Sequence, residues 1–312
     1  MTSSFAELAA TLPWFFPAVA FAVGACVGSF LNVVIYRLPA GRSVIRPASH
    51  CACGAPIAWH DNLPILSWLI RRGRARCCGR PFSFRYLVVE LLTALVFLAC
   101  WRLSPPARAV CGWIFLSGLI GAAFIDLDHM MIPDAFSLGL GVAGVLLSLL
   151  VPALHGEVSG FFALDSLRSG AAGLEGLLLG SGLVLWIALL AGAVLKKEAM
   201  GLGDVKFAGA IGAFCGWRGA VFALFGGAVL GTVWLGLALA GGKLFRLAPS
   251  PAPNAKPVPS DVESASFNAE SVPLTIGARV PFGPMLAAGG ALYFLALHGP
   301  VDAWFAKFLA LF

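Results

Sequence analysis

Two acidic residues stand at the ends of apolar segments, where carboxylates could do chemistry. Asp126 closes one apolar run and Asp204 opens another. A carboxylate at the edge of hydrocarbon is expensive to desolvate, so each of the two raises a functional hypothesis. Two such groups a few ångströms apart, with little water, hold one proton between them. One could then act as general base toward a water molecule while the other protonates a peptide carbonyl oxygen, as in an aspartic protease.

The residues around Asp204 fit this chemistry. Gly201 and Gly203 precede it and Lys206 follows it. Because glycine has no side chain, a second helix or a substrate backbone can approach closely there. We therefore expect Gly201, Gly203 and Lys206 to support the active site. Spacing alone leaves two other interpretations open, in which Asp126 and Asp204 form a structural ion pair with Lys206 or a proton relay in a transporter.

Three more polar residues follow Asp126 and have simpler interpretations. Asp128 and Asp134 are expected as ordinary groups of the membrane interface. His129 could be a metal ligand or a base, but a lone histidine at a helix end is more often interfacial. Asp134 follows Pro133 and could cap the next helix. None of the three is needed for the chemistry proposed above.

The composition indicates what must position these residues. Of 312 residues, 59% are hydrophobic and 12% are charged, and the mean hydropathy is +0.90, well outside the range of soluble domains. Apolar runs of roughly 20 residues, enough for a helix to cross about 30 Å of hydrocarbon, recur along the chain. The sequence therefore predicts an all-α polytopic membrane protein, a bundle of about eight transmembrane helices with one cytoplasmic loop domain. The spans are expected at roughly 14–36, 86–103, 109–126, 135–153, 171–195, 205–218, 219–242 and 281–298.

Basic residues predict the orientation of this bundle. Nine arginines border or lie inside one loop: Arg37, Arg42, Arg46, Arg71, Arg72, Arg74, Arg76, Arg80 and Arg85. The positive-inside rule makes the loop cytoplasmic, which places Asp126 and Asp204 at the cytoplasmic face and both termini outside the cytoplasm. The same arrangement accounts for the net charge of +6. We therefore expect membrane lipid, and no nucleic acid, as a partner.

Four cysteines lie in the basic loop: Cys51, Cys53, Cys77 and Cys78. The reducing cytoplasm disfavours disulfides, so metal binding is the better hypothesis. Four thiolates would complete the tetrahedral sphere that zinc prefers. Two alternatives stay open: His50 could replace one thiolate, or the cysteines could be packing residues.

These features divide the chain into five parts. The first three are an N-terminal transmembrane helix at 1–37, a cytoplasmic loop domain with the possible zinc site at 38–85, and a catalytic transmembrane bundle at 86–243. They are followed by a polar linker at 244–280, whose proline, serine and alanine are typical of a disordered connection. The fifth part is a C-terminal transmembrane segment at 281–312.

An ordered set of motifs resembles one family. Its N-terminal part comprises Gly28–Pro39 (GSFLNVVIYRLP), Asp61–Trp68 (DNLPILSW), and Arg85-Tyr86 with Glu90. The set continues with Ile125-Asp126 through Ile132-Pro133-Asp134, then Gly201–Lys206 (GLGDVK) and Val280–Pro284 (VPFGP). In type and order these motifs resemble the type IV prepilin peptidases, leader peptidase/N-methyltransferases of the GxGD-type intramembrane aspartyl protease class.

The resemblance implies that Asp126 and Asp204 are the catalytic aspartates. It implies cleavage of the basic leader of type IV prepilins or pseudopilins after a glycine, at the cytoplasmic face of the bacterial inner membrane, for a type IV pilus or type II secretion. It further implies N-methylation of the new N-terminal residue, usually phenylalanine, with S-adenosylmethionine as donor. No residue can be assigned to that donor from the sequence. A peptidase that cleaves without methylating and a proton-coupled transporter remain alternatives.

The chain departs from the family pattern in its loop. The family often has two CxxC pairs, whereas this chain has Cys51-Ala52-Cys53 and Cys77-Cys78. Ligands so close in sequence strain a chelate, so the spacing alters the expected zinc geometry. The insert at 244–280 is a second departure, and it leaves the catalytic motifs intact.

Overall fold

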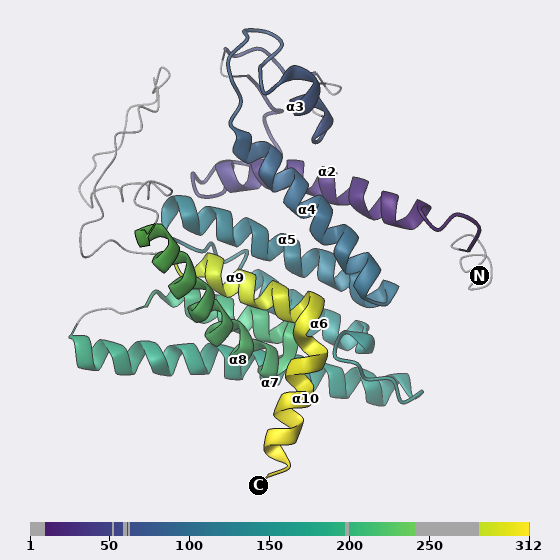
Figure 1. Ribbon diagram of the computed structural model, residues 1–312, viewed down its shortest axis with the longest axis vertical. Coiled ribbons are helices and arrows are strands. Elements are labelled where there is room, and N and C mark those ends of the chain that lie inside the picture. The colour runs from purple at the N-terminus through teal and green to yellow at the C-terminus, as the bar shows by residue number, and fades with distance from the viewer. Residues whose placement is uncertain are drawn as a thin grey trace.

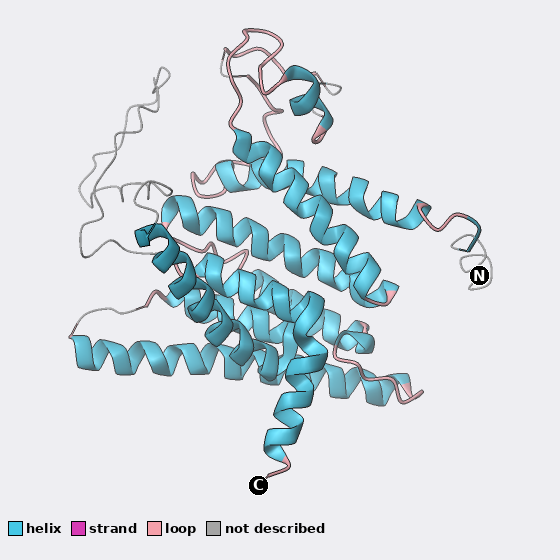
Figure 2. Cartoon of the chain, viewed as in Figure 1, coloured by secondary structure: helices cyan, strands magenta, loops and turns pink. Residues whose placement is uncertain are grey.

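A computed structural model describes residues 10–51, 53–58, 61, 63–196, 200–240 and 281–311. In this part of the chain the regular elements are helices and no strand is formed (Figure 2). The β-type pairing in the described loop consists of two isolated bridges, His50 with Pro56 and Arg74 with Pro81. The predicted all-α class is therefore confirmed. The predicted linker at 244–280 lies outside the described residues.

The helices follow the apolar runs of the sequence. In the part of the chain that the structure describes, six helices are long and apolar enough to cross a membrane: α2 (Phe15–Arg37), α4 (Phe84–Leu103), α5 (Pro106–His129), α7 (Phe162–Leu195), α8 (Leu202–Ala240, apolar to Leu237) and the run Gly283–Leu309. That last run contains α9 (Gly283–Leu292), a π-helical turn (Tyr293–Leu297) and α10 (His298–Leu309). The shorter elements are α3 (Leu66–Arg71), α6 (Leu138–Leu150) and the 3-10 turn η2 (Pro152–Leu154).

The difference between six long helices and the eight predicted spans has two causes. The fourth predicted span corresponds to α6, which has only 13 residues. The sixth and seventh predicted spans belong to α8, whose 39 residues are interrupted at Gly216 (φ 69°, ψ 176°). A positive φ of this kind favours glycine. A straight helix of that length would extend about 58 Å, nearly twice the hydrocarbon thickness, so the break divides α8 into two shorter pieces.

The helices pack as neighbouring pairs. α2 lies along α4, α7 along α8, and α8 along α9, while α5 contacts α2, α4 and α9 (Figure 1). The α7–α8 pair is held very close by glycine, because a Cβ on Gly212 would lie 2.0 Å from the carbonyl oxygen of Gly176. Close backbone approach through small residues is the usual basis of helix packing in membranes. This pairing fixes the N-terminal half of α8, which contains Asp204.

The segment between α2 and α4 forms a separate loop region that contains α3. It lies beyond one end of the α2–α4 pair, at the top of Figure 1. Trp68 of α3 packs edge to face on Phe84, the first residue of α4, with ring centroids 5.6 Å apart. This contact joins the loop region to the helical bundle.

Candidate active site

Asp126 lies in the last turn of α5, with its side chain buried. The helix ends three residues later because Met130 adopts a left-handed conformation (φ 52°), and its N–H donates to the carbonyl oxygen of Asp126 at 2.9 Å. The preceding residue, Ile125, is fully buried and anchors this turn in the core. The carboxyl group of Asp126 is therefore held in a fixed position at one end of the bundle.

The start of α9 reaches the same carboxyl group. The backbone N–H of Gly283 donates to Asp126 Oδ2 at 3.0 Å. A Cβ at position 283 would lie 2.6 Å from that oxygen and 3.1 Å from Ile132 Cδ1, so only glycine fits without displacement. The sequence alone assigns no role to Gly283. The signal that could have found it is a glycine between Phe282 and Pro284 at the opening of the last apolar run.

Asp204 lies half-buried in the first turn of α8. Its backbone N–H donates to the carbonyl oxygen of Gly201 at 3.2 Å. A Cβ on Gly203 would lie 3.5 Å from Ile132 Cβ. Since Ile132 contacts both Gly203 and Gly283, the regions around Asp204 and Asp126 meet at this residue.

The two carboxyl groups are near enough for the charge of Asp126 to act on Asp204. The structure thus brings into one region two residues 78 positions apart in the chain (204 minus 126). Gly201 borders the pair, since a Cβ there would lie 3.9 Å from Asp204 Oδ2. Two acidic groups that share a partly buried site are suited to hold one proton in common.

Lys206 takes a different partner from the catalytic candidates. Its Nζ donates to Asp134 Oδ1 at 2.8 Å, which ties α8 to the segment between α5 and α6. Asp134 does not cap the next helix with its side chain, because α6 begins after Ser137. The backbone carbonyl of Asp134 instead accepts from the N–H of Gly139 at 2.9 Å. The cap that Asp134 could have formed is therefore absent.

The remaining polar residues at the end of α5 have structural surroundings. Arg85, near the start of α4, donates to Asp128 Oδ1 at 2.5 Å and to the carbonyl oxygen of Phe124 at 2.9 Å. Its guanidinium group also lies 5.0 Å from the ring centre of Phe124. Arg85 therefore fastens α4 to the helical turn that carries Asp126. His129 is exposed at the last position of α5.

The four loop cysteines converge from two tight turns. In the first turn Cys51 donates its N–H to Ala55 and Gly54 adopts a positive φ of 84°. In the second, Ala75 donates to Arg80 and Gly79 has a φ of 67°. Each turn presents two sulfur atoms to the other: those of Cys51, Cys53, Cys77 and Cys78, all within 4.8 Å of one another.

This sulfur cluster fits zinc. Cys53 Sγ lies 3.3 Å from Cys77 Sγ, and Cys51 Sγ lies 3.5 Å from Cys78 Sγ. A tetrahedral ion with Zn–S bonds of about 2.3 Å requires sulfur atoms about 3.8 Å apart. Small side-chain rotations would supply that spacing, so the shortened CxC and CC pairs do not prevent tetrahedral ligation. His50 is exposed and lies outside the set of converging ligand atoms.

The thiols differ in acidity. A hydrogen bond from the backbone N–H of Cys53, together with one from the Cys77 thiol, lowers the pKa of Cys51 to about 7. The side-chain hydrogen bonds of Cys77 with Cys53 and Cys51 raise the pKa of Cys77 to about 12. One thiolate is thus available near neutral pH before any metal binds, and metal binding would release the other protons.

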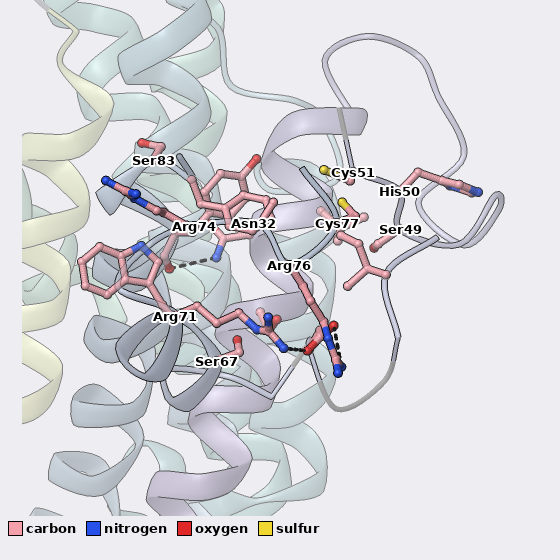
Figure 3. A pocket seen from close by; sticks show the side chains of 18 of the residues that line it. Asn32, Ser49, His50, Cys51, Ser67, Arg71, Arg74, Arg76, Cys77 and Ser83 are labelled. Atoms are coloured by element: carbon pink, nitrogen blue, oxygen red, sulfur yellow. Dashed lines mark hydrogen bonds and ion pairs between the residues drawn. The ribbon is translucent and has the colours of Figure 1, made fainter. Parts of the chain in front are cut away.

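A cavity of about 850 Å³ lies between the loop region and the adjoining ends of α2 and α4. In Figure 3, Cys51 and Cys77 lie close together at one wall, while Arg71 and Ser67 lie at another. The catalytic candidates Asp126 and Asp204 do not line it. The described residues therefore contain two neighbouring carboxyl groups and, apart from them, a cavity beside a zinc-type cluster.

The fold and site together define a polytopic membrane protein with a paired-aspartate site at one end of its helices. Comparison with known families identifies it further. The bacterial peptidase A24 N-terminal domain matches residues 22–103, and the type IV leader peptidase family matches residues 113–236. The chain belongs to the type IV leader peptidase family. The resemblance found in the sequence motifs is thereby confirmed.

Several curated relatives share this family. A prepilin leader peptidase/N-methyltransferase of Myxococcus xanthus is 38% identical over 227 residues, which cover 69% of this chain and 62% of the relative. The corresponding protein of Klebsiella pneumoniae is 38% identical over 227 residues, covering 68% of this chain and 90% of the relative. That of Aeromonas hydrophila is 36% identical over 239 residues, which cover 68% of this chain and 77% of the relative. The chain thus spans less than two thirds of the Myxococcus relative. No solved structure matches it significantly.

Proposed function

We propose that this membrane protein removes the leader of type IV prepilins or pseudopilins and methylates the new N-terminus. The observation that carries the proposal is the nearness of Asp126 and Asp204 around Ile132 at one end of the bundle, in a chain of the type IV leader peptidase family. The names of the relatives cover both activities. The aspartates account for the hydrolytic one.

The contacts of the two aspartates give each a role in peptide hydrolysis. Asp126 Oδ2 accepts from the N–H of Gly283, the first residue of α9. This donor and the positive end of the helix favour the charged form of Asp126, whose second oxygen is free to take a proton from water. The shared proton then resides on Asp204, which donates it to the scissile carbonyl oxygen. Collapse of the tetrahedral intermediate returns a proton from Asp126 to the leaving amine.

The orientation of the substrate follows from the distribution of charge. The arginine-rich loop places its end of the bundle in the cytoplasm, and both aspartates with it. The apolar helix of a prepilin would lie in the membrane beside the bundle, with its leader on the cytoplasmic side. Anionic lipid would separate the basic leader from the loop arginines. Depth in the membrane then sets which peptide bond reaches the aspartates.

The loop serves the second activity in this proposal. Zinc held by the four cysteines would fix the two turns against one another. S-adenosylmethionine supplies an electrophilic methyl group when bound. The rest of the loop would bring the processed N-terminus to that donor.

Separate Asp126→Asn and Asp204→Asn substitutions test the peptidase proposal. Each removes one partner of the acid–base pair while keeping the shape of the side chain, so each should reduce prepilin conversion by at least about 10³-fold. Asp128→Asn is the matched control, because it lies on the same helix end but pairs with Arg85. Conversion is followed by the gel shift of full-length prepilin in membranes.

Full conversion by either aspartate variant would refute the assignment. A proton-coupled transporter that uses the same pair predicts that the purified wild-type protein leaves prepilin uncut. A cleavage-only peptidase predicts a processed product with an unmodified N-terminus, which mass spectrometry of the wild-type product would reveal.

A further inference from the structure

A second group of charged residues lies at the end of the bundle away from the aspartates. Arg108 stands in the first turn of α5, whereas Asp126 stands in the last. The two are 18 residues apart (126 minus 108), which is about 27 Å of helix and close to the thickness of the hydrocarbon layer. Arg108 Nη1 donates at 3.1 Å to Nε2 of His298, the first residue of α10. The start of α10 is therefore placed at the opposite end of the bundle from the candidate active site.

The break in α8 brings a second arginine to this end. Arg218 follows the break at Gly216 by two residues, so it lies where the two pieces of α8 join. Arg218 Nη1 lies 3.9 Å from Asp302 Oδ1. Asp302 is one turn after His298 on α10, so the two side chains face the same side of that helix. Contacts thus connect four residues into one cluster, the α5–α10 cluster: Arg108, Arg218, His298 and Asp302.

Three nitrogen atoms of this cluster are buried without a hydrogen-bond partner in the described part of the chain: Arg108 Nε, Arg218 Nε and His298 Nδ1. Each of them is a donor. Arginine nitrogens only donate, so His298 Nε2 accepts from Arg108 and the proton of the neutral ring lies on Nδ1. A buried donor without an acceptor costs free energy. The cluster is therefore suited to meet an acceptor that the described residues do not provide.

The cluster also carries an excess of positive charge. Among the described residues, Arg108 forms no ion pair with a carboxylate, and Arg218 has the distant one to Asp302. Two guanidinium groups and one carboxylate leave one positive charge, which is expensive at the edge of a membrane unless it is paired. In the orientation proposed above this end faces away from the cytoplasm, where the positive-inside rule disfavours arginine. A singly charged anion would satisfy both the charge and the donors.

The arginines indicate the kind of anion. In both of them Nη1 is engaged and Nε is unpartnered within the described chain. The side of a guanidinium group that contains Nε binds two oxygen atoms of a carboxylate or phosphate in a fork geometry. The side chains of Arg218 and Asp302 are 34% and 39% exposed, so the cluster can be reached from the surface. An anion with several oxygen atoms therefore fits better than a halide.

α10 provides apolar surface beside the cluster. It leads away from α9 at this end of the bundle (Figure 1), and none of its residues is buried. Trp304 and Phe308 are exposed and stack with ring centroids 5.6 Å apart. Trp217, next to Arg218, packs edge to face on Phe305 at 5.2 Å, which holds this aromatic surface against the cluster. Aromatic side chains of this kind are typical of the membrane–water interface, where the phosphates of lipids lie.

We propose that the α5–α10 cluster binds the phosphate diester of a membrane phospholipid, with Arg108, Arg218 and His298 as donors. A soluble phosphate has the same chemistry, but the aromatic face of α10 favours a molecule whose acyl chains lie beside that helix. The bound headgroup ties α10 and the join in α8 to the start of α5. The inference depends neither on proteolysis nor on methyl transfer, because no residue of the cluster belongs to the candidate active site.

Arg108→Met tests the site in the full-length protein purified in detergent. Methionine keeps an unbranched apolar stem and removes the charge and the donors. Dioleoylphosphatidylglycerol should raise the melting temperature of the delipidated wild type by about 5 °C. In Arg108→Met the lipid should bind about 10- to 100-fold more weakly, as followed by native mass spectrometry. Arg102→Met is the matched control, because Arg102 is exposed at the same end, in the last turn of α4.

Arg218→Met covers the case in which Arg108→Met does not fold. Loss of lipid binding in either arginine variant, with normal binding in Arg102→Met and prepilin cleavage within about twofold of wild type, supports the proposal. Binding at wild-type strength in each folded variant of the cluster would overturn it. An equal loss in Arg102→Met would also overturn it, since general surface charge would then explain the effect.

Two further ligands test the wild type without any variant. Monogalactosyldiacylglycerol has acyl chains but no phosphate, and it should leave the melting temperature within about 1 °C of the lipid-free value. A gain equal to that from phosphatidylglycerol would show that the phosphate is not recognised. Inorganic phosphate alone should also give no comparable gain. If it did, the lipid would be excluded as the source of the phosphate, and the cluster would be a site for a soluble anion.

Discussion

The backbone N–H of Gly283 donates to Asp126 Oδ2 at 3.0 Å, which joins the beginning of α9 to the end of α5 across 157 positions of sequence. The bond satisfies one of the N–H groups that a helix leaves free at its N-terminus. It also fixes one carboxyl oxygen of Asp126 and leaves the other for chemistry. Gly283, from the VPFGP motif that directly adjoins the insert, therefore contacts the candidate active site.

Gly283→Ala should reduce prepilin cleavage. The added Cβ would lie 2.6 Å from Asp126 Oδ2, so either α9 or the carboxyl group must shift. A displacement of this size at a catalytic group lowers the rate by about 10- to 100-fold. The rate is measured as kcat/KM on purified prepilin in detergent.

Gly299→Ala is the control for that substitution, because a Cβ on Gly299 meets no atom within 4 Å. It should cleave at the wild-type rate. Equal rates for the two alanine variants would show that the Gly283 contact does not position Asp126.

Lys206 and Asp134 should act on cleavage as a pair. Their ion pair of 2.8 Å is exposed, and it tethers α8 beside Asp204 to the segment that follows α5. Exposed pairs contribute up to about 1 kcal/mol, so Lys206→Met and Asp134→Asn should each lower kcat/KM by less than about tenfold. The double variant should be no worse than the more damaging single one. A much larger loss in Lys206→Met than in Asp134→Asn would show that Lys206 acts on the catalytic pair directly.

The loop cluster should bind one zinc ion per chain. Elemental analysis of the purified protein should find zinc in the wild type and lose it in Cys53→Ser and Cys77→Ser. His50→Ala should retain zinc, since the sulfur atoms converge without the imidazole. Zinc lost from His50→Ala but retained in Cys53→Ser would show that the histidine completes the site.

Zinc retention should also depend on pH. The metal binds thiolates, and protons compete for them. The pKa of Cys51 is about 7 and that of Cys77 about 12. Lowering the pH below neutrality therefore protonates both thiols and favours the release of zinc. Dialysis against a chelator at pH 5.5 should therefore remove zinc faster than dialysis at pH 8. Equal rates at both values would contradict thiolate ligation.

Asp126 and Asp204 could be located from the sequence because a carboxylate at the edge of hydrocarbon costs free energy to desolvate. A residue with that cost is usually there for a function. The sequence could not place Gly283, since a single backbone N–H has no signature in the residue types. Lys206 shows a related limit. Its position two residues after Asp204 indicates nearness to the site, but the partner it takes depends on how the segment containing Asp134 folds back.

Some helix boundaries are likewise predictable from the sequence, and others depend on tertiary contacts. The expected first and second spans agree with α2 and α4 to within a few residues. α7 begins at Phe162, well before the predicted start at 171. The polar residues there indicate a loop, but Asp165 accepts from the N–H of Ser159 at 2.9 Å and stabilises the early turn. Hydrogen bonds of this kind are tertiary details that composition does not report.

Acid should destabilise the protein through His155, which follows the η2 turn. Its Nε2 lies 3.0 Å from Ser148 Oγ, and burial lowers its pKa from 6.5 to about 4. The unfolded chain therefore takes up a proton first as the pH falls. Stability from neutral His155 is fully present above pH 6.5 and declines between pH 6.5 and 4, by up to about 3 kcal/mol. The melting temperature in detergent should fall over this window, and less so in His155→Gln. His129→Gln, at an exposed site, should retain the wild-type pH dependence. An equal fall in the wild type and in His155→Gln would show that other groups control acid stability.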